Sequence, residues 1–247
     1  MDPLSDVLSL LKLHSYMSGG FDCGGEWSLG FGQHAGIKVY AAVSGECWLS
    51  VKGVSDPVRV VAGDCFLLPR GLPFCLASDL ALKPLDAMTI FPAKRKGGIS
   101  TYQGGGNFFS VGGHFALTGE YASTLSGMLP PIVHIRNEPD KAALRWSVER
   151  MRQELREPQP GGFLIAQQLA TMLLVQALRL HLEDGLNSGV GWLFALADKQ
   201  MAAALNAMHN DLAAPWTLQS LAQRAGMSRT SFTLKFKERS GCRPLST

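Results

Sequence analysis

Hydroxyl and basic side chains recur in one stretch near the end of the chain, with a spacing that suits contact with nucleic acid. Phe232 and Phe236 lie four residues apart there, so a helix through this stretch turns both rings to one side. At about 100° per residue, the opposite side and its flanks carry Arg229, Thr230, Ser231, Thr233, Leu234, Lys235 and Lys237. Hydroxyl groups can hydrogen-bond base edges, and guanidinium and ammonium groups bind phosphates. The stretch is therefore a candidate DNA-binding helix.

Positive charge is concentrated in the same part of the chain. From Trp216 onward there are six basic residues and one acidic residue, out of 23 basic and 20 acidic residues in the whole sequence. A local charge of +5 therefore stands against −2 in the remainder, within an overall net charge of +3. Phosphate contacts require this kind of local excess.

A second short helix precedes the candidate DNA-binding helix. Leu218–Ala225 places apolar residues at the i, i+3 and i+4 positions of a buried stripe. Gly226 suits a left-handed helix end, and Ser228 is a natural N-cap for the next helix. The pair predicts a helix-turn-helix, supported by a preceding helix over Trp192–Met208. The alternative is an ordinary helical hairpin at the end of a larger domain.

Composition indicates a soluble, two-domain or large single-domain protein. The chain has 247 residues, of which 46% are hydrophobic and 17% charged, enough for a packed core. Its five cysteines include no CxxC pair and suit reduced thiols, with Cys47, Cys65 and Cys75 as small core residues. The N-terminus lacks the pattern of a signal peptide, and no stretch approaches the roughly 20 apolar residues of a membrane span. We expect a cytoplasmic protein without membrane contact.

The first half of the chain has the pattern of an antiparallel barrel or sandwich. Short segments rich in Val, Tyr, Phe and Trp alternate with Gly-containing turns, which is typical of such folds. The predicted strands are Ile37–Val43, Glu46–Val51, Val58–Val61 and Cys65–Pro69, with further strands at Leu85–Phe91, Asn107–Val111 and Phe115–Leu117. Gly97–Gly106 is predicted to be a loop.

Three further helices and one linker are predicted in the rest of the chain. Leu4–Leu13 is predicted to be a short helix, and Asp184–Gly191 a linker between domains. Ala142–Leu155 and Phe163–Leu182 are predicted to be longer helices, and the second is apolar around more than one face. Such a helix packs on two surfaces, either within one chain or against the same helices of a second subunit in a symmetric dimer.

The predicted barrel offers a candidate small-molecule pocket. Aromatic walls with a few polar groups typify such sites, and the candidate lining residues are His34, Tyr40, Trp48 and Phe66. The alternative is that Trp48 and Phe66 are simply barrel core.

A catalytic metal site in the barrel is a competing hypothesis. Histidines and a carboxylate would have to converge from neighbouring strands, and the sequence offers His34 with Glu46 and His114 as partners. The HxH spacing fails because residue 36 is Gly, and Phe74 stands where a metal-binding cupin usually has His. No GxSxG nucleophile motif is present either. We therefore expect no catalytic residues, bound metal or cofactor, and no enzyme activity.

Two blocks of sequence resemble AraC/XylS-type transcriptional regulators with an N-terminal cupin-like effector domain. The first block comprises Gly45–Leu49, Gly63-Asp64, Leu68–Gly71, Phe74 and Leu129–Pro131; the second comprises Met201–His209, Trp216–Ala222, Gly226–Arg229, Phe232, Phe236, Gly241 and Pro244. The resemblance implies an α+β chain with a cupin-like effector and dimerisation domain over residues 1–184 and an all-α helix-turn-helix domain over residues 192–247. It implies double-stranded promoter DNA and a small-molecule effector as partners, and a homodimer.

The chain departs from that family pattern at two points. Members have two helix-turn-helix units joined by a long helix, whereas this chain reaches Thr247 just after the Gly241–Pro244 turn and offers only the first unit. Leu234 occupies a position that such proteins commonly give to a polar or basic residue, although leucine can contact a thymine methyl group. The alternatives to a sequence-specific regulator are a truncated dimerisation partner without strong DNA binding and a metal-dependent cupin enzyme.

Overall fold

The computed structural model of the chain describes residues 5, 8, 14–91, 98–116, 118, 126, 129–185, 199–211 and 214–240. They fall into two compact units. Among the described residues, one unit contains residues 14–91, 98–116 and 129–180, and the other contains residues 5, 8, 118, 126, 181–185, 199–211 and 214–240. Three expected features lie largely or wholly outside the described residues: the helix at Leu4–Leu13, the linker at Asp184–Gly191 and the Gly241–Pro244 turn.

The larger unit contains two sheets. The first has the strand order β11-β6-β3-β10-β1-β9 and is antiparallel except where β1 pairs with β9. Its strands are β1 (His14–Cys23), β3 (Ile37–Ser44), β6 (Cys65–Leu68), β9 (Ile99–Tyr102), β10 (Phe108–Ala116) and β11 (Val133–Ile135). The second has the order β5-β4-β7-β2-β8 and consists of β2 (Ser28–Phe31), β4 (Glu46–Val51), β5 (Val58–Val61), β7 (Phe74–Ala77) and β8 (Leu85–Asp86), followed by the short helix α2 (Ala87–Ile90).

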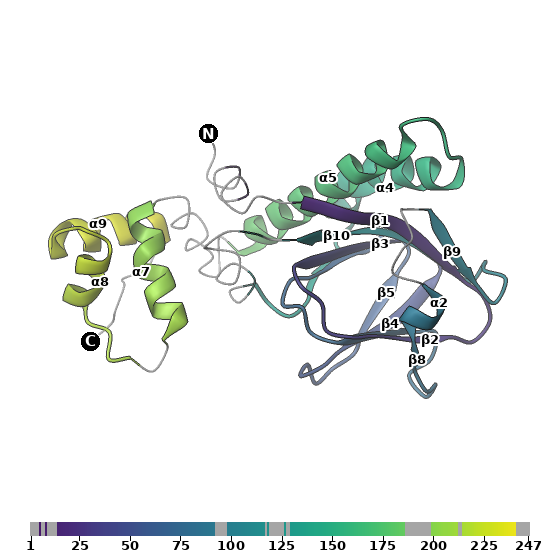
Figure 1. Ribbon diagram of the computed structural model, residues 1–247, viewed down its shortest axis with the longest axis horizontal. Helices are drawn as coiled ribbons and strands as arrows, with labels where there is room; N and C mark the ends of the chain where they lie inside the picture. The colour runs from purple at the N-terminus through teal and green to yellow at the C-terminus, as the bar shows by residue number, and fades with distance from the viewer. Residues whose placement is uncertain are drawn as a thin grey trace. The chain divides into compact units, whose positions relative to one another are not determined.

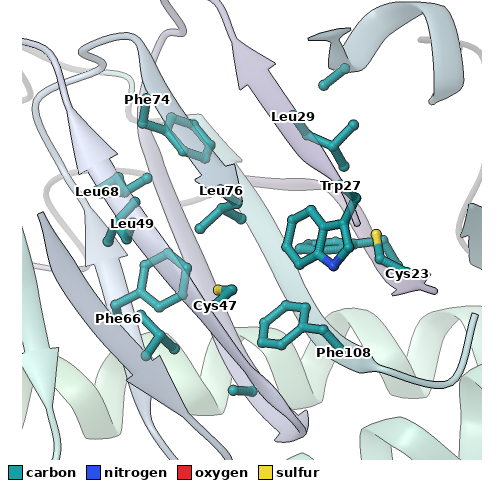
Figure 2. Packing of buried hydrophobic residues seen from close by; sticks show 14 of the residues in the cluster. Cys23, Trp27, Leu29, Cys47, Leu49, Phe66, Leu68, Phe74, Leu76 and Phe108 are labelled. Carbon is teal, nitrogen blue, oxygen red and sulfur yellow. The ribbon is translucent and has the colours of Figure 1, made fainter. Parts of the chain in front are cut away.

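The hydrophobic core lies between these sheets. Phe66 and Phe108 of the first sheet pack with Leu49 and Leu76 of the second in one buried cluster, which Trp27 also joins (Figure 2). Each of the five side chains is at most 2% exposed. Burying apolar area on this scale is the main favourable contribution to folding, and it fixes which face of each strand points inward.

Two helices cover the other face of the first sheet (Figure 1). These are α4 (Glu138–Arg156), which contacts β1, β3 and β10, and α5 (Gly162–Gly185). A Cβ on Gly113 would lie 2.8 Å from Ala170 Cβ, so small residues allow α5 and β10 to approach closely. Because both faces of the first sheet are covered, β6 is buried at every residue, whereas β4 alternates between buried and more exposed positions.

The prediction that no stretch approaches the apolar length of a membrane span is wrong for helix α5. Residues Gly162–His181 have a mean hydropathy of 1.4 and are long and apolar enough to cross a membrane by those criteria alone. The core helix of a soluble protein meets the same criteria, and α5 has a buried side: Ala166, Leu169, Ala170, Leu173, Leu174 and Ala177 are at most 4% exposed. The breadth of its apolar surface, which the sequence indicated, is confirmed.

Strand predictions succeeded where the apolar alternation is regular. The expected strands at Ile37–Val43, Glu46–Val51, Val58–Val61 and Cys65–Pro69 are confirmed as β3 to β6. Leu85–Phe91 is wrong as a single strand, because the Asp86 side chain accepts a hydrogen bond from the Met88 amide and starts helix α2. Two other predictions were wrong in extent: β10 is one continuous strand across Gly112 and Gly113, and the loop expected at Gly97–Gly106 contains β9.

The smaller unit is helical. It contains α7 (Lys199–Asn210), α8 (Leu218–Arg224) and α9 (Arg229–Ser240), and α8 contacts both of the other helices. The Trp216 indole donates a hydrogen bond of 2.7 Å to the Asp211 carbonyl, which closes the connection between α7 and α8. The helix expected over Trp192–Met208 is confirmed from residue 199 onward.

Removing a core ring should cost far more stability than removing a ring on the outer sheet face. Phe66 is fully buried, whereas Trp48 is half-buried and points away from the core that Cys47 and Leu49 enter. We expect Phe66→Ala to lower the free energy of unfolding by about 3–5 kcal/mol, and Trp48→Ala by clearly less. Urea denaturation of both variants measures this, and equal losses would contradict the assigned orientation of β4.

Candidate functional site

In the smaller unit, helices α8 and α9 are joined by a tight turn whose ends are fixed by hydrogen bonds. Thr217 caps α8 by accepting a 3.1 Å bond from the Ser220 amide, and the Ser220 hydroxyl accepts one from the Thr217 amide. At the other end Gly226 has φ +64°, and the amides of Gly226 and Met227 donate to the Gln223 and Ala222 carbonyls. This is a Schellman ending, which favours Gly at that position. The role expected for Gly226 is confirmed.

The turn between α8 and α9 fixes the rotation of α9 about its own axis. Ser228 Oγ accepts a 3.1 Å hydrogen bond from the Ser231 amide, so the predicted N-cap is confirmed. Phe232 and Phe236 are 0% and 6% exposed, and their ring centroids are 5.6 Å apart. Leu221 of α8 is also fully buried. With this side of α9 buried within the unit, its opposite side faces outward.

The predicted DNA-binding residues are divided between the outward face and the flanks of α9. Arg229, Thr230, Ser231, Leu234 and Lys237 are exposed, whereas Thr233 and Lys235 are half-buried. Leu234 is 60% exposed, which is unusual for a large apolar side chain that has no core role.

Two of these side chains have partners within the unit. The Lys235 ammonium donates a 3.1 Å hydrogen bond to Gln200 Oε1 of α7. The Thr233 hydroxyl donates to the Arg229 carbonyl at 2.8 Å, within the helix itself. Arg229 and Lys237 are therefore the better placed basic groups of α9 for phosphate contact.

The structure brings together three of the four candidate pocket residues of the barrel and separates the fourth. Tyr40 and Phe66 have ring centroids 5.3 Å apart, and Tyr40 lies 6.2 Å from Phe74. His34 lies 6.0 Å from the same Phe74 ring. Trp48 points to the opposite face of its sheet and joins neither group.

Sequence reasoning missed the most unusual side chain of this region, Lys38. Its ammonium lies 5.2 Å from the ring centroid of Phe31 and 5.0 Å from that of Phe74. The signal was present in the sequence: Lys38 is two residues from Tyr40 in a predicted strand, so both side chains leave the same face. His34 and His114 stand close by, with ring centroids 5.4 Å apart.

Burial suppresses the charges of this cluster. It lowers the pKa of His34 to about 4, with a further contribution from the Lys38 and His114 charges. It also lowers the pKa of His114 to about 4 and that of Lys38 to about 8. Near neutral pH the cluster therefore holds two neutral imidazoles and one ammonium.

The residues do not assemble the metal site considered from the sequence. Glu46 is ion-paired with Arg59 at 2.5 Å, with both side chains more than half exposed. Within the described part of the chain, no three His, Cys, Asp or Glu side chains are grouped to hold a metal ion. His34 and His114 share their neighbourhood with the Lys38 ammonium, which repels a metal cation.

Comparison with known proteins covers nearly the whole chain. A family model described as Cupin matches residues 2–183. A putative AraC-like transcription regulator from Streptomyces lividans is 38% identical over 246 residues, covering 99% of this chain and 81% of that protein. The HTH-type transcriptional regulator AlkR from Acinetobacter baylyi is 25% identical, over 96% of this chain and 79% of AlkR. A crystal structure of a variant of apo ToxT from Vibrio cholerae aligns with a TM-score of 0.39 and 10% identity, over 92% of this chain and 94% of that chain.

The two histidines should destabilise the barrel in mild acid. Their pKa values of about 4 in the folded chain lie below the unfolded value of 6.5, so between these pH values the unfolded chain binds more protons and stability falls as pH falls. We expect the double variant His34→Gln, His114→Gln to lose less stability between about pH 7 and pH 5, by ~1 kcal/mol per histidine. Urea denaturation at both pH values measures the difference, and parallel pH dependences for the wild type and the variant would contradict it.

Proposed function

This chain belongs to the AraC-like family of transcription regulators, and from that premise we propose that its α8–α9 pair reads promoter DNA sequence-specifically. The observation that carries the proposal is the orientation of α9, whose phenylalanines are buried while its basic and hydroxyl side chains face outward. A recognition helix of a helix-turn-helix contacts base edges with just such a face.

Roles follow from the geometry of α9. Thr230 at the exposed N-terminal turn is assigned to base contacts, and Leu234 to a thymine methyl group. Arg229 and Lys237 are assigned to phosphates, where they position the helix without reading sequence. Lys235 and Thr233 are given secondary roles because their polar groups already have partners.

Affinity is expected to be low for one copy of this module. A single module of this kind buries roughly 600–1,000 Å² of protein surface on DNA, at the small end of the range. The expected binding is therefore weak and strongly salt-dependent, unless a second module is supplied by a partner subunit.

We propose a homodimer that forms through the helices over the first sheet. Leu164, Ile165 and Met172 of α5 are 64%, 40% and 40% exposed, on the side of the helix opposite its buried residues. Trp146 of α4 adds an aromatic side chain that is 64% exposed. Exposed apolar groups in this number mark interaction sites, and self-association would place two recognition helices on one DNA.

We propose that the cupin domain binds a small-molecule effector. In this proposal residues 1–184 form the effector and dimerisation domain, and residues 192–247 form the DNA-binding domain. The relatives named above are transcription regulators, which supports a role without enzyme activity, in the cytoplasm where promoter DNA lies. An effector regulates only if it binds two arrangements of the protein with different affinity. The α5 surface favours one alternative: a dimerisation partner that itself binds DNA weakly.

DNA binding should depend on the outward basic residues of α9 and on salt. We expect Lys237→Gln and Arg229→Gln each to reduce the slope of log K against log salt by about 0.9, the value for one phosphate contact. Fluorescence anisotropy on DNA from the upstream region of the gene, titrated at several salt concentrations, measures the slope.

Lys52→Gln is the matched control, because it removes the same charge from an exposed turn of the barrel. Its slope should equal that of the wild type. Equal slopes for all three variants would contradict the assignment, and an absence of DNA binding by the wild type would overturn the proposal that α8–α9 reads DNA.

Self-association should depend on the exposed side of α5. We expect Leu164→Glu to shift the chain from dimer to monomer at micromolar concentration with little change in unfolding free energy, because this side chain is 64% exposed. Sedimentation velocity measures the distribution, and Leu80→Glu, at an exposed leucine of the barrel, is the control. A wild type that is already monomeric overturns the proposed homodimer.

A further inference from the structure

The Lys38 ammonium occupies an unusual place at one end of the barrel. It projects from β3 of the first sheet, on the same face as Tyr40. It approaches two rings of the second sheet, with distances from the ammonium to the ring centroids of 5.2 Å for Phe31 and 5.0 Å for Phe74. These rings are stacked, with centroids 4.5 Å apart and an interplanar angle of 3°. Because the rings are parallel, the ammonium can face the π surface of only one of them.

No acidic side chain of the described residues neutralises Lys38. The ion pairs of the barrel and its helices use other basic groups: Arg59, His134, Lys141, Arg150, Arg152 and Arg156. An ammonium that is partly removed from water without a counter-ion is unfavourable, and burial lowers its pKa to about 8. One aromatic face compensates only part of that cost.

His34 provides a second unsatisfied group beside the same ring. Both of its ring nitrogens are shielded from solvent. The Ala35 and Gly36 backbone lies close enough to raise its pKa slightly against the effect of burial, but neither nitrogen makes a hydrogen bond of normal geometry with the described residues. A neutral imidazole has one N–H to donate, so His34 can donate to an anion while Lys38 supplies the charge. His114 contributes differently, because its Nε2 is already 2.5 Å from the Ala35 carbonyl oxygen.

An apolar groove adjoins the two rings that the ammonium approaches. An open groove of about 660 Å³ is lined by Phe31 and Phe74 together with Val51, Leu85 and Met88, and its charged lining residues are Lys52 and Asp86. The two rings that the ammonium approaches thus also form part of the groove wall. Small-molecule sites have this volume and this combination of apolar walls with few polar groups.

We propose that Lys38 and His34 bind the charged group of a small organic monoanion, a carboxylate with a compact apolar body, whose apolar part lies against Phe31 and Phe74. A single charge matches the single ammonium, and the aromatic walls favour an apolar body over a sugar or a nucleotide. The inference rests on the proposed function in one respect, since it assigns a chemical class to the ligand of the cupin domain.

The test compares an acid with its neutral isostere on the full chain. Isothermal titration calorimetry with cyclohexanecarboxylate and cyclohexanecarboxamide, without DNA, should show at least tenfold tighter binding of the acid. Lys38→Met should reduce acid binding to the level of the amide, and His34→Phe should weaken it several-fold. Arg136→Met, which removes an exposed basic group after β11 and outside the groove, should leave the acid's affinity unchanged.

Equal affinity for acid and amide in the wild type, including no binding of either up to about 10 mM, overturns the proposal. So does undiminished acid binding by Lys38→Met, or an equal loss in Arg136→Met. Circular dichroism checks that Lys38→Met is folded. If it is not, Lys38→Gln, which also removes the ammonium, replaces it. DNA is absent from this measurement, so its failure and a failure of DNA recognition by α9 are distinguishable.

Discussion

The space between the two sheets must be filled, and the structure depends on the aromatic rings that fill it. Phe21, Phe66 and Phe108 come from different strands of the first sheet, and each packs against residues of the second. Gly112 contributes by having no side chain, because a Cβ there would lie 2.8 Å from the Tyr40 ring. With the rings in place, the inward face of every neighbouring strand is fixed, and so is the outward face. The cluster of Lys38, His34 and His114 places three titratable side chains beside this largely apolar interior.

The first sheet also carries the helices, and buried polar contacts hold it to one of them. Asp64, which is 2% exposed, lies 2.9 Å from both the Lys141 ammonium of α4 and His134 Nε2 of β11. Paired charges of this kind are costly to break singly, so the start of α4 is anchored to the sheet. Strand β3 bears Lys38 and Tyr40 on its core face and the buried Val39 on its other face, and it contacts α4. The candidate pocket and the helical layer therefore share a strand.

The sequence predicted the helix-turn-helix well because its signals are local. Gly226 and Ser228 act through backbone conformation and a hydrogen bond three residues away, and both roles are confirmed. The pocket was predicted less well. Alternate residues of a strand face opposite sides, so the sequence already places Trp48 opposite Cys47 and Leu49, and Lys38 on the same face as Tyr40. The pocket prediction was based on residue type alone, and it therefore included Trp48 and missed Lys38.

Other features could not be obtained from local patterns. His34 and His114 are 80 residues apart in the chain and meet only because β10 pairs with β3. The Lys235–Gln200 bond joins helices from separate segments, and it changes which lysine of α9 is free to bind phosphate. Helix α2 replaced an expected strand because one aspartate accepted an amide hydrogen bond, a contact that competes with strand formation in many sequences.

The central claim is that the outward face of α9 lies in the groove of promoter DNA. The most direct measurement is photo-cross-linking with benzoylphenylalanine placed at Thr230, and at Asp56 on an exposed turn of the barrel as the control. The account predicts a covalent adduct with DNA bases from the first position that unlabelled promoter DNA suppresses, and none from the second. Equal adducts from both positions, or none from Thr230 under conditions where the DNA is bound, would contradict it.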